Sequence, residues 1–221
     1  MSHFLEEVDL VRNPEPRIPC VLLLDTSGSM IEDDNIHALN EGVQHMIDDI
    51  KADSLTRKRV ELAIVTFGGR AIVRHDFQDV VDLTFTPFQA TGGTPMGEAI
   101  TTGLRLLENR KQEYKKHNVN YFRPIMWLMT DGLATDDIQG PARKVARTVQ
   151  EAGLNMFCVG VEGADFDQLK TISPSPMRLK DSKFTDMFMW LSNSMKAISE
   201  SQPGQKVAMP PGHDVWGEIQ A

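Results

Sequence analysis

The sequence predicts an α/β fold: a doubly wound, mostly parallel sheet with helices on both faces and one antiparallel hairpin at an edge. Short runs of continuous apolar residues, such as 21–24 and 125–129, have the length of strands that are buried on both faces. Between them lie longer segments whose apolar residues recur every three or four positions, as in amphipathic helices. Because the two patterns alternate along the chain, a sheet covered by helices on both sides is expected.

The predicted strands are apolar runs bounded by polar residues or turn signals. They are residues 18–25, 60–68, 71–77, 123–131, 154–161 and 176–180. Gly68 and Gly69 separate the second run from the third, which predicts an antiparallel hairpin at that point. The last and shortest run is expected at an edge of the sheet. Residues 82–88 fit either an extended segment or a loop.

The predicted helices lie between these strands or after them and carry apolar stripes. They are residues 35–50, 95–107, 138–149, 166–172 and 184–199. Asp33 or Asp34 is expected to cap the first helix. Pro95 is expected to open the second, because the first turn of a helix does not use the N–H that proline lacks. The third helix is expected to turn Val145 and Val149 inward, and the last is apolar over a wide arc, which predicts deep burial or a second covered surface.

A single domain of residues 17–200 accounts for all of these elements. Residues 1–16 form a short leader ahead of it. Residues 201–221 contain three prolines and three glycines without apolar periodicity, which predicts a flexible, loosely packed tail. A small docking patch at Val215–Trp216 is the alternative interpretation of the tail.

Composition and charge argue against several functional classes. The chain has 221 residues and a formal net charge of -8, whereas a protein that binds a phosphate backbone is usually basic on at least one face. The short basic cluster at 55–60 is interpreted as a solvated loop. No stretch approaches the roughly 18 apolar residues of a membrane-spanning helix, and the acidic N-terminal residues do not resemble a secretory signal. We therefore expect a cytoplasmic protein that binds neither nucleic acid nor membrane.

Three predicted loops bring oxygen-bearing side chains to the same edge of the sheet. "DTSGS" at 25–29 ends the first strand, "MTDG" at 129–132 ends a second acid-tipped strand, and "QATGGTPMGE" at 89–98 leads into a helix. The carboxyl ends of parallel strands share one edge, and ligands bind there where the strand order reverses. The oxygen ligands that we expect at this edge are Asp25, Ser27, Ser29, Thr94 and Asp131.

Hydroxyl and carboxylate oxygens together favour a hard divalent cation, Mg²⁺ or Mn²⁺, with water molecules completing an octahedron. Two carboxylates roughly balance the charge of such an ion, and neutral hydroxyls leave it able to accept an acid from a partner. Gly28 is expected to allow a tight turn between the two serines, and Gly92 and Gly93 to allow a close approach of the second loop. Taken alone, "DTSGS" also fits a strand-to-helix turn with serine caps.

These motifs resemble the von Willebrand factor A domain. "DTSGS", the Thr94 of "GGTP" and the Asp131 of "MTDG" match the order and approximate spacing of its metal-ion-dependent adhesion site, and the resemblance covers roughly residues 17–200. It implies that Ser27, Ser29 and Thr94 contact the metal directly, whereas Asp25 and Asp131 act largely through water.

Three longer segments suggest a narrower resemblance. "RIPCVLLLDTSGSM", "GGTPMGEAI" and "WLMTDG" are most similar to stand-alone intracellular bacterial proteins linked to tellurite-resistance gene clusters. In that group the family association is with protein kinases and phosphatases, which implies a partner of either kind.

We therefore expect a protein-binding module and not an enzyme. The bound cation would hold an acidic side chain of a partner, with further contacts at Met30, Gly93 and Trp190, although Trp190 is alternatively covered by a neighbouring loop or the tail. A metal-dependent phosphohydrolase is the alternative function. It needs a base or nucleophile beside the metal, but the three loops contain no histidine, and Ser27 stands where a phosphoaspartate enzyme has a second carboxylate.

Overall fold

The computed structural model describes residue 10 and residues 13–208 and 210–220, so most of the predicted leader 1–16 lies outside the described residues. The strands are β1 Ile18–Asp25, β2 Val60–Gly68, β3 Arg70–Asp79, β4 Ile125–Thr130, β5 Asn155–Gly160, β6 Met177–Leu179 and β7 Gly217–Ile219. The helices are η1 Gly28–Asp34, α2 Asn35–Ala52, α3 Thr56–Arg59, η2 Val80–Asp82, α4 Met96–Lys116, α5 Gln139–Gln150, α6 Phe166–Ile172, α7 Phe184–Ser199 and α8 His213–Trp216, where η marks a 3-10 helix.

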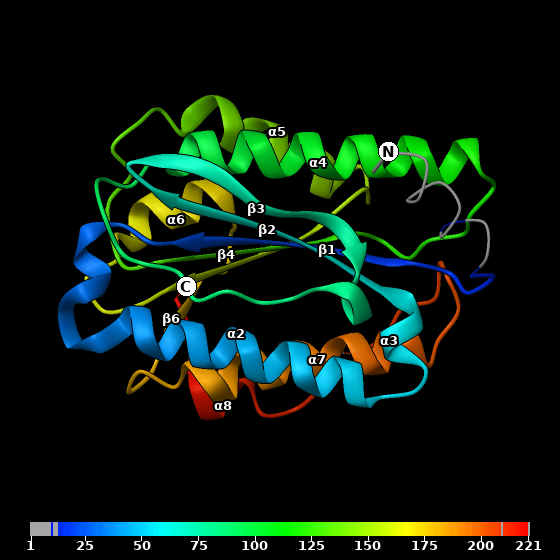
Figure 1. Cartoon of the computed structure of the whole chain (residues 1–221). Coiled ribbons are helices and arrows are strands. Elements are labelled where there is room, and N and C mark those ends of the chain that lie inside the picture. Colours follow the sequence, from blue (N-terminus) through cyan, green and yellow to red (C-terminus); the bar gives the residue numbers. More distant parts are fainter. Residues whose placement is uncertain (1–9, 11–12, 209, 221) are drawn as a thin grey trace.

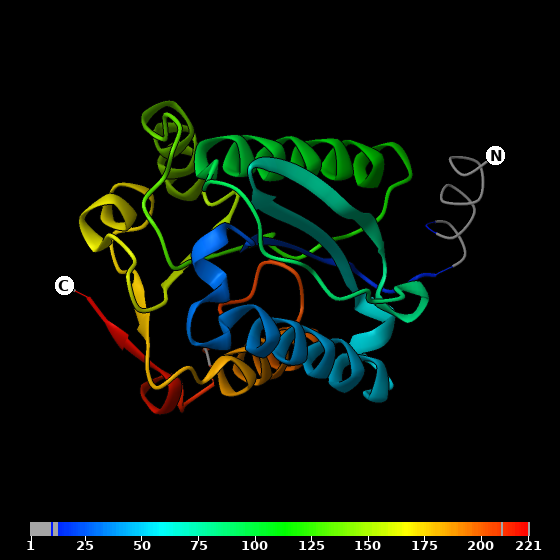
Figure 2. The same cartoon turned by 60° about the vertical axis from the view of Figure 1, so that its left-hand side comes forward.

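The described strands form one seven-stranded sheet in the order β3-β2-β1-β4-β5-β6-β7. Strands β2, β1, β4, β5 and β6 run parallel, whereas β3 and β7 are antiparallel to their neighbours. The predicted fold class and the edge hairpin β2–β3 are thus confirmed. The prediction that β6 forms an edge is wrong, because β7 pairs with it and makes a second antiparallel edge (Figure 2).

Helices cover both faces of the sheet, with α4, α5 and α6 on one side and α2 and α7 on the other (Figure 1). Alternate residues of β1 enter two separate cores. Leu22 and Leu24 pack with α2 and α7, whereas Val21 and Leu23 pack with α4 and α5. Burial on both faces explains why these strands are continuous apolar runs in the sequence.

Two local predictions differ from the structure. Asp34 occupies the position before α2 in a left-handed conformation, with φ of 58°, and its side chain makes no capping hydrogen bond. Val145 is buried as predicted, whereas Val149 is exposed. Val149 lines a surface pocket together with residues of α6. Residues 83–95 form a loop, which is one of the two alternatives expected for 82–88. No helix in the described part of the chain combines the length and apolar character needed to cross a bilayer.

Most described residues between 200 and 215 are exposed or half-buried, but α8 and β7 at the end of this segment pack against the domain, which the prediction of a flexible tail did not include. Trp216 is buried, and its ring lies 6.0 Å from that of Trp127 and 5.5 Å from that of Trp190. The indole N–H of Trp190 donates to the carbonyl oxygen of Pro210 at 2.9 Å. A large aromatic side chain supplies this burial without a periodic pattern.

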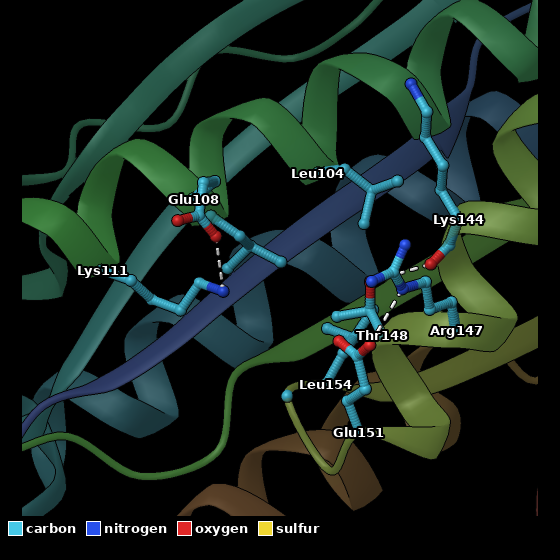
Figure 3. A pocket seen from close by; sticks show the side chains of 10 residues that line it. Leu104, Glu108, Lys111, Lys144, Arg147, Thr148, Glu151 and Leu154 are labelled. Carbon is cyan, nitrogen blue, oxygen red and sulfur yellow. Dashed lines mark hydrogen bonds and ion pairs between the residues drawn. The ribbon is translucent and has the colours of Figure 1, made fainter.

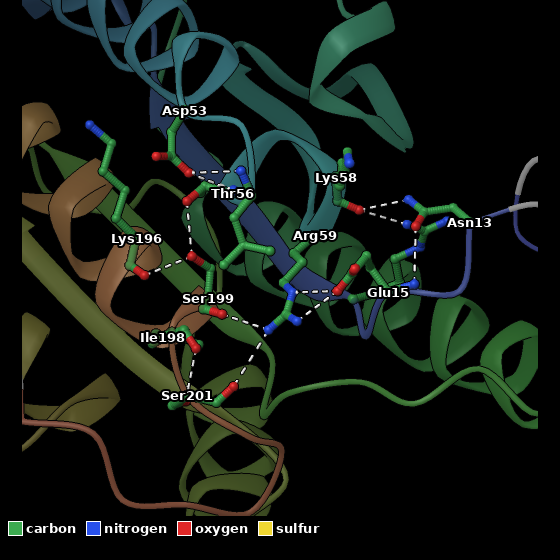
Figure 4. Close-up of polar contacts among 12 residues, drawn as sticks. Asn13, Glu15, Asp53, Thr56, Lys58, Arg59, Lys196, Ile198, Ser199 and Ser201 are labelled. Atoms are coloured by element: carbon green, nitrogen blue, oxygen red, sulfur yellow. Dashed lines mark hydrogen bonds and ion pairs between the residues drawn. The ribbon is translucent and has the colours of Figure 1, made fainter.

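Polar contacts hold the end of α7 against α3 and the segment before β1 (Figure 4). Arg59 donates to the carbonyl oxygen of Ser199 at 2.5 Å and pairs with Glu15 at 2.6 Å. The hydroxyls of Thr56 and Ser199 are 2.9 Å apart. A cation at a helix C-terminus interacts favourably with the carbonyl groups that the helix leaves without partners.

A buried ion cluster lies at the edge where the parallel strands begin. Glu61 of β2 is completely buried, 3.1 Å from Nε of Arg17 and 2.6 Å from Nε of Arg110. The hydroxyl of Tyr114 donates to the same carboxylate at 2.5 Å. Nearby, burial raises the pKa of Asp79 to about 6. Cations contributed by two distant segments therefore neutralise the Glu61 carboxylate.

Candidate metal centre

The chain reverses its course across the sheet between β1 and β4. From β1 the sheet extends to β2 and β3, and the chain then returns to place β4 on the other side of β1. The carboxyl ends of β1 and β4 consequently flank the crevice in which open α/β sheets bind ligands. Asp25 is the last residue of β1, and Asp131 directly follows the last residue of β4.

A continuous chain of hydrogen bonds joins four of the predicted ligands. The hydroxyl oxygens of Ser27 and Ser29 are 3.0 Å apart, and the Ser29 hydroxyl donates to Oδ1 of Asp131 at 2.8 Å. The backbone N–H of Ser27 donates to Oδ1 of Asp25 at 2.8 Å. The "DTSGS" loop therefore connects the two acid-tipped strands.

Thr94 reaches the same cluster from the glycine-rich loop before α4. A Cβ atom placed on Gly132 would lie 3.4 Å from Oγ1 of Thr94 and 3.9 Å from Oγ of Ser29. The backbone N–H of Gly28 donates to the carbonyl oxygen of Gly92 at 2.9 Å, which holds the two loops together. All five predicted oxygen ligands thus meet at one place.

Glycine is required at one loop contact but not at another. Gly92 has φ of 72°, and a Cβ atom there would lie only 2.6 Å from the Cα of Gly69, so the expected close approach is confirmed. Gly28 has no left-handed conformation, and a Cβ atom on it would meet the carbonyl oxygen of Gly92 at an ordinary 3.5 Å. The expectation that the turn between the serines depends on Gly28 is therefore wrong.

Asp25 is completely buried, and only neutral groups bind its carboxylate. Oδ1 accepts from the N–H of Ser27, and Oδ2 accepts from the hydroxyl of Thr130. Burial raises the pKa of Asp25 to about 6, and the like charge of Asp131 adds to the rise, against the lowering effect of these hydrogen bonds. Burial also raises the pKa of Asp131, and the negative charge of Glu32 adds to this rise.

This arrangement fits a hard divalent cation. Among the described residues, no ion pair joins Asp25 or Asp131 to a basic side chain. A buried charge without a partner is strongly unfavourable, and a dication between the two carboxylates would remove that cost. Among the residues that the structure describes, no group of three or more His, Cys, Asp or Glu side chains is arranged to bind a metal ion. A metal at this place therefore depends on the hydroxyl oxygens as well.

Two residues beside Asp131 are missing from the predicted site. The Thr130 hydroxyl holds Oδ2 of Asp25, and Gly132 lies beside the hydroxyls of both Thr94 and Ser29. Both stand in the "MTDG" motif, next to the predicted ligand. The signal was their position immediately before and after that acid.

The three predicted partner contacts lie in different environments. Gly93 is exposed in the glycine-rich loop. Met30 is completely buried, so its predicted exposure is wrong: the 3-10 turn directs Met30 into the core and leaves the next residue, Ile31, exposed. Trp190 is buried beneath the C-terminal segment, as the alternative interpretation expected.

The pocket in Figure 3 lies away from this cluster, between α4 and α5. Lys111 pairs with Glu108 at 2.7 Å, and Arg147 pairs with Glu151 at 2.9 Å. None of the five oxygen ligands lines this pocket. Because its charged side chains largely neutralise one another, we assign it no ligand.

Comparisons with known proteins agree with this fold. Residues 20–191 match the von Willebrand factor type A domain family. Cochlin from Homo sapiens is 34% identical over 86 residues, which make up 39% of this chain and 14% of cochlin. The matched segment therefore spans only a small part of that relative's length.

Two solved structures share the architecture at low sequence identity. The pilus adhesin SpaC from Lactobacillus rhamnosus GG, in an open conformation, has a TM-score of 0.63 and 16% identity, covering 85% of this chain and 31% of SpaC. The manganese-loaded TRAP protein of Plasmodium vivax has a TM-score of 0.50 and 20% identity, covering 72% of this chain and 63% of TRAP. Because the family match spans most of the sequence, including all five predicted oxygen ligands, the chain belongs to the von Willebrand factor type A domain family.

Proposed function

We propose that this protein is a metal-dependent module for binding other proteins. In this proposal a divalent cation, Mg²⁺ or Mn²⁺, is held by Asp25, Ser27, Ser29, Thr94 and Asp131 and binds a carboxylate of the partner. One observation carries the proposal: the Ser29 hydroxyl contacts Ser27 and Asp131 together, which gathers hydroxyls and uncompensated carboxylates at one edge of the sheet.

The ligands differ in depth and charge. Asp25 is completely buried and anchors the inner side of the cluster, whereas Ser29 is exposed and stands at its outer side. The bound cation would supply the positive charge that attracts and holds an acid. Because the three hydroxyl ligands are neutral, two carboxylates alone offset that charge, and the ion keeps its attraction for a further carboxylate.

Two proteins with a similar fold support the proposal, one as an adhesin and the other as a metal-bound protein. SpaC is a pilus adhesin, and the TRAP structure is manganese-loaded. Both are less than 25% identical to this chain, so the metal and the partner are our proposals for this protein.

We extend the proposal to a cytoplasmic bacterial complex of the stress-response or tellurite-resistance type, in which the partner is a protein kinase or phosphatase. The support is the resemblance of residues 17–30, 92–100 and 127–132 to proteins of that group.

A pull-down in the presence of Mg²⁺ or of EDTA tests the proposal. The expected result is a kinase or phosphatase retained by the wild type with Mg²⁺ and lost both with EDTA and in Ser27→Ala. Ser201→Ala is the matched control, because Ser201 lies beyond α7 and away from the cluster. Retention that is equal in EDTA contradicts the proposal. Phosphoester turnover that Asp25→Ala abolishes would support a phosphohydrolase instead.

A further inference from the structure

Two exposed aliphatic side chains flank the oxygen ligands. Ile31 is 65% exposed and Leu133 is 56% exposed, the highest values among the large apolar side chains of the described residues. Each follows a ligand by two positions, Ile31 after Ser29 and Leu133 after Asp131. Because Ser29 donates a hydrogen bond to Asp131, the two loops that carry these side chains are joined directly. An exposed apolar surface beside a polar site is typical of a protein-binding surface.

Three acidic side chains follow Ile31 directly. Glu32, Asp33 and Asp34 are exposed, and none makes a side-chain hydrogen bond or ion pair within the residues that the structure describes. Asp33 and Asp34 have φ of 51° and 58°, a left-handed conformation that few non-glycine residues adopt. The loop therefore presents three carboxylates to solvent directly after Ile31.

These acids determine the charge that a partner meets. Glu32 lies close enough to Asp131 for its charge to act on that carboxylate. A partner that brought only acidic groups would be attracted by the cation but repelled by the surrounding acids. A basic residue beside the partner's acid removes this repulsion, because complementary charges favour binding and like charges oppose it.

A third side of the cluster is formed by the glycine-rich loop before α4. Gly92 and Gly93 are exposed and carry no side chains. Their carbonyl oxygens accept hydrogen bonds from Gly28 and Gly69, which fix the loop against its neighbours. The backbone of this loop is therefore accessible to an extended segment of a partner, with the exposed Thr135 side chain beside Gly93.

We propose that the site recognises a short protein segment that combines three kinds of residue. One acid binds the metal, an aliphatic or aromatic residue covers Ile31 and Leu133, and a Lys or Arg pairs with the carboxylates of residues 32–34. This inference rests on the proposed function, because the acid binds through the cation. Covering the exposed side chains of Ile31 and Leu133 is expected to increase the affinity for the partner about tenfold.

Selection from a random peptide library displayed on phage tests the inference. The immobilised wild type is exposed to the library in Mg²⁺, and bound phage are eluted with EDTA. We expect the eluted peptides to be enriched in an acid next to an apolar residue and a Lys or Arg. The variant with Ile31→Ser and Leu133→Ser should select the acid without the apolar residue. Val81→Ser is the control, because Val81 is also exposed but lies in η2, after β3.

A synthetic copy of one selected peptide makes the test quantitative. Replacing its apolar residue with alanine should weaken binding to the wild type about tenfold, but less than about twofold in the double serine variant, as in a double-mutant cycle. Replacing its basic residue should weaken binding to the wild type more than to a variant with Glu32→Gln, Asp33→Asn and Asp34→Asn. Asparagine is chosen there because it tolerates the left-handed conformation.

The possible failures are distinguishable. Peptides that elute with EDTA and carry an acid without any enrichment of apolar residues overturn the inference but leave the proposed function intact. A wild type that binds Mn²⁺ but selects no EDTA-eluted peptide overturns the proposed function and the inference together. The inference is also overturned if replacing the peptide's apolar residue with alanine lowers its affinity tenfold both for the wild type and for the double serine variant. The apolar residue then contacts another surface.

Discussion

Two completely buried carboxylates on neighbouring strands have opposite surroundings. Glu61, near the start of β2, is paired with the guanidinium groups of Arg17 and Arg110. Asp25, at the end of β1, is bound only by an N–H and a hydroxyl, and the neighbouring charge that acts on it is a second carboxylate, Asp131. Because β1 and β2 are parallel, the two acids lie at opposite edges of the sheet.

We interpret the charge cluster around Glu61 as structural and the cluster around Asp25 as a binding site. At the edge where the strands begin, the charges are balanced by the protein itself and no ligand is needed. At the edge where they end, the positive charge is missing, although pairing is the usual condition for burying a carboxylate. This missing positive charge, and not the raised pKa that Asp25 shares with Asp79, is why we interpret the second edge as the place of the cation.

Removal of the paired carboxylate should have the largest effect on stability. Glu61→Ala removes the carboxylate that pairs with the buried guanidinium of Arg17 and with Arg110, and we expect a loss of about 3–5 kcal/mol in the free energy of unfolding. Urea unfolding measures the loss, which should be the same with Mg²⁺ and with EDTA. Glu113→Ala, a change at a more exposed acid of α4, is the control. A loss that Mg²⁺ reverses would show that the two edges are not independent.

The second expected effect is a pH dependence of the metal-free protein. Burial raises the pKa of Asp25 to about 6, so between about pH 4 and pH 6 the unfolded chain releases a proton that the folded protein retains. The free energy of unfolding should therefore fall as the pH rises through this window, by about 3 kcal/mol for a shift of this size. Asp25→Asn should flatten the curve, measured by urea unfolding in EDTA.

Asp79 provides the matched control at the opposite edge, because burial raises its pKa to about 6 as well. Its contribution falls in the same pH window, and Asp79→Asn should remove it. Saturating Mg²⁺ should abolish the contribution of Asp25 and leave that of Asp79 unchanged. A pH dependence that is identical with and without Mg²⁺ would contradict the role given to Asp25.

A smaller effect is expected from Thr130→Val. The change keeps the shape of the side chain but removes the hydroxyl that donates to Oδ2 of Asp25. We expect a loss of about 1–2 kcal/mol without metal, because a buried oxygen is left without its donor. Thr66→Val is the comparison, since Thr66 lies on the adjacent strand β2 and its hydroxyl accepts a hydrogen bond from Arg74 of β3. Only Thr130→Val should also weaken Mg²⁺ binding, and equal Mg²⁺ affinities would contradict this account.

The meeting of the five proposed metal ligands was predictable because it depends on regular features of the sequence. Asp25, Ser27 and Ser29 are neighbours in the chain, and the rule that parallel strands end at one edge brings Asp131 to them. Thr94 required the additional signal of glycines before a helix. The prediction of Met30 as an exposed contact failed, because the direction of a side chain in a short 3-10 turn does not follow strand or helix periodicity.

Features made by distant segments were not predictable in the same way. Glu61 stands in an apolar run, and nothing near it in the sequence identifies Arg17 or Arg110 as its partners. The strand β7 has three residues, too few for a pattern, and Trp216 is buried through a single aromatic contact cluster. Such contacts depend on packing between elements, which local propensity does not encode.

Metal binding by the wild type and by Asp25→Asn tests the central claim most directly. Calorimetric titration with Mn²⁺ or Mg²⁺ at neutral pH should give one ion per chain for the wild type. Asp25→Asn keeps the size of the side chain but removes its charge, and its affinity should be lower by more than about tenfold. Glu113→Gln should bind like the wild type. A wild type that binds neither ion, or an Asp25→Asn protein that binds as tightly as the wild type, would contradict the claim that the uncompensated carboxylate belongs to a metal site.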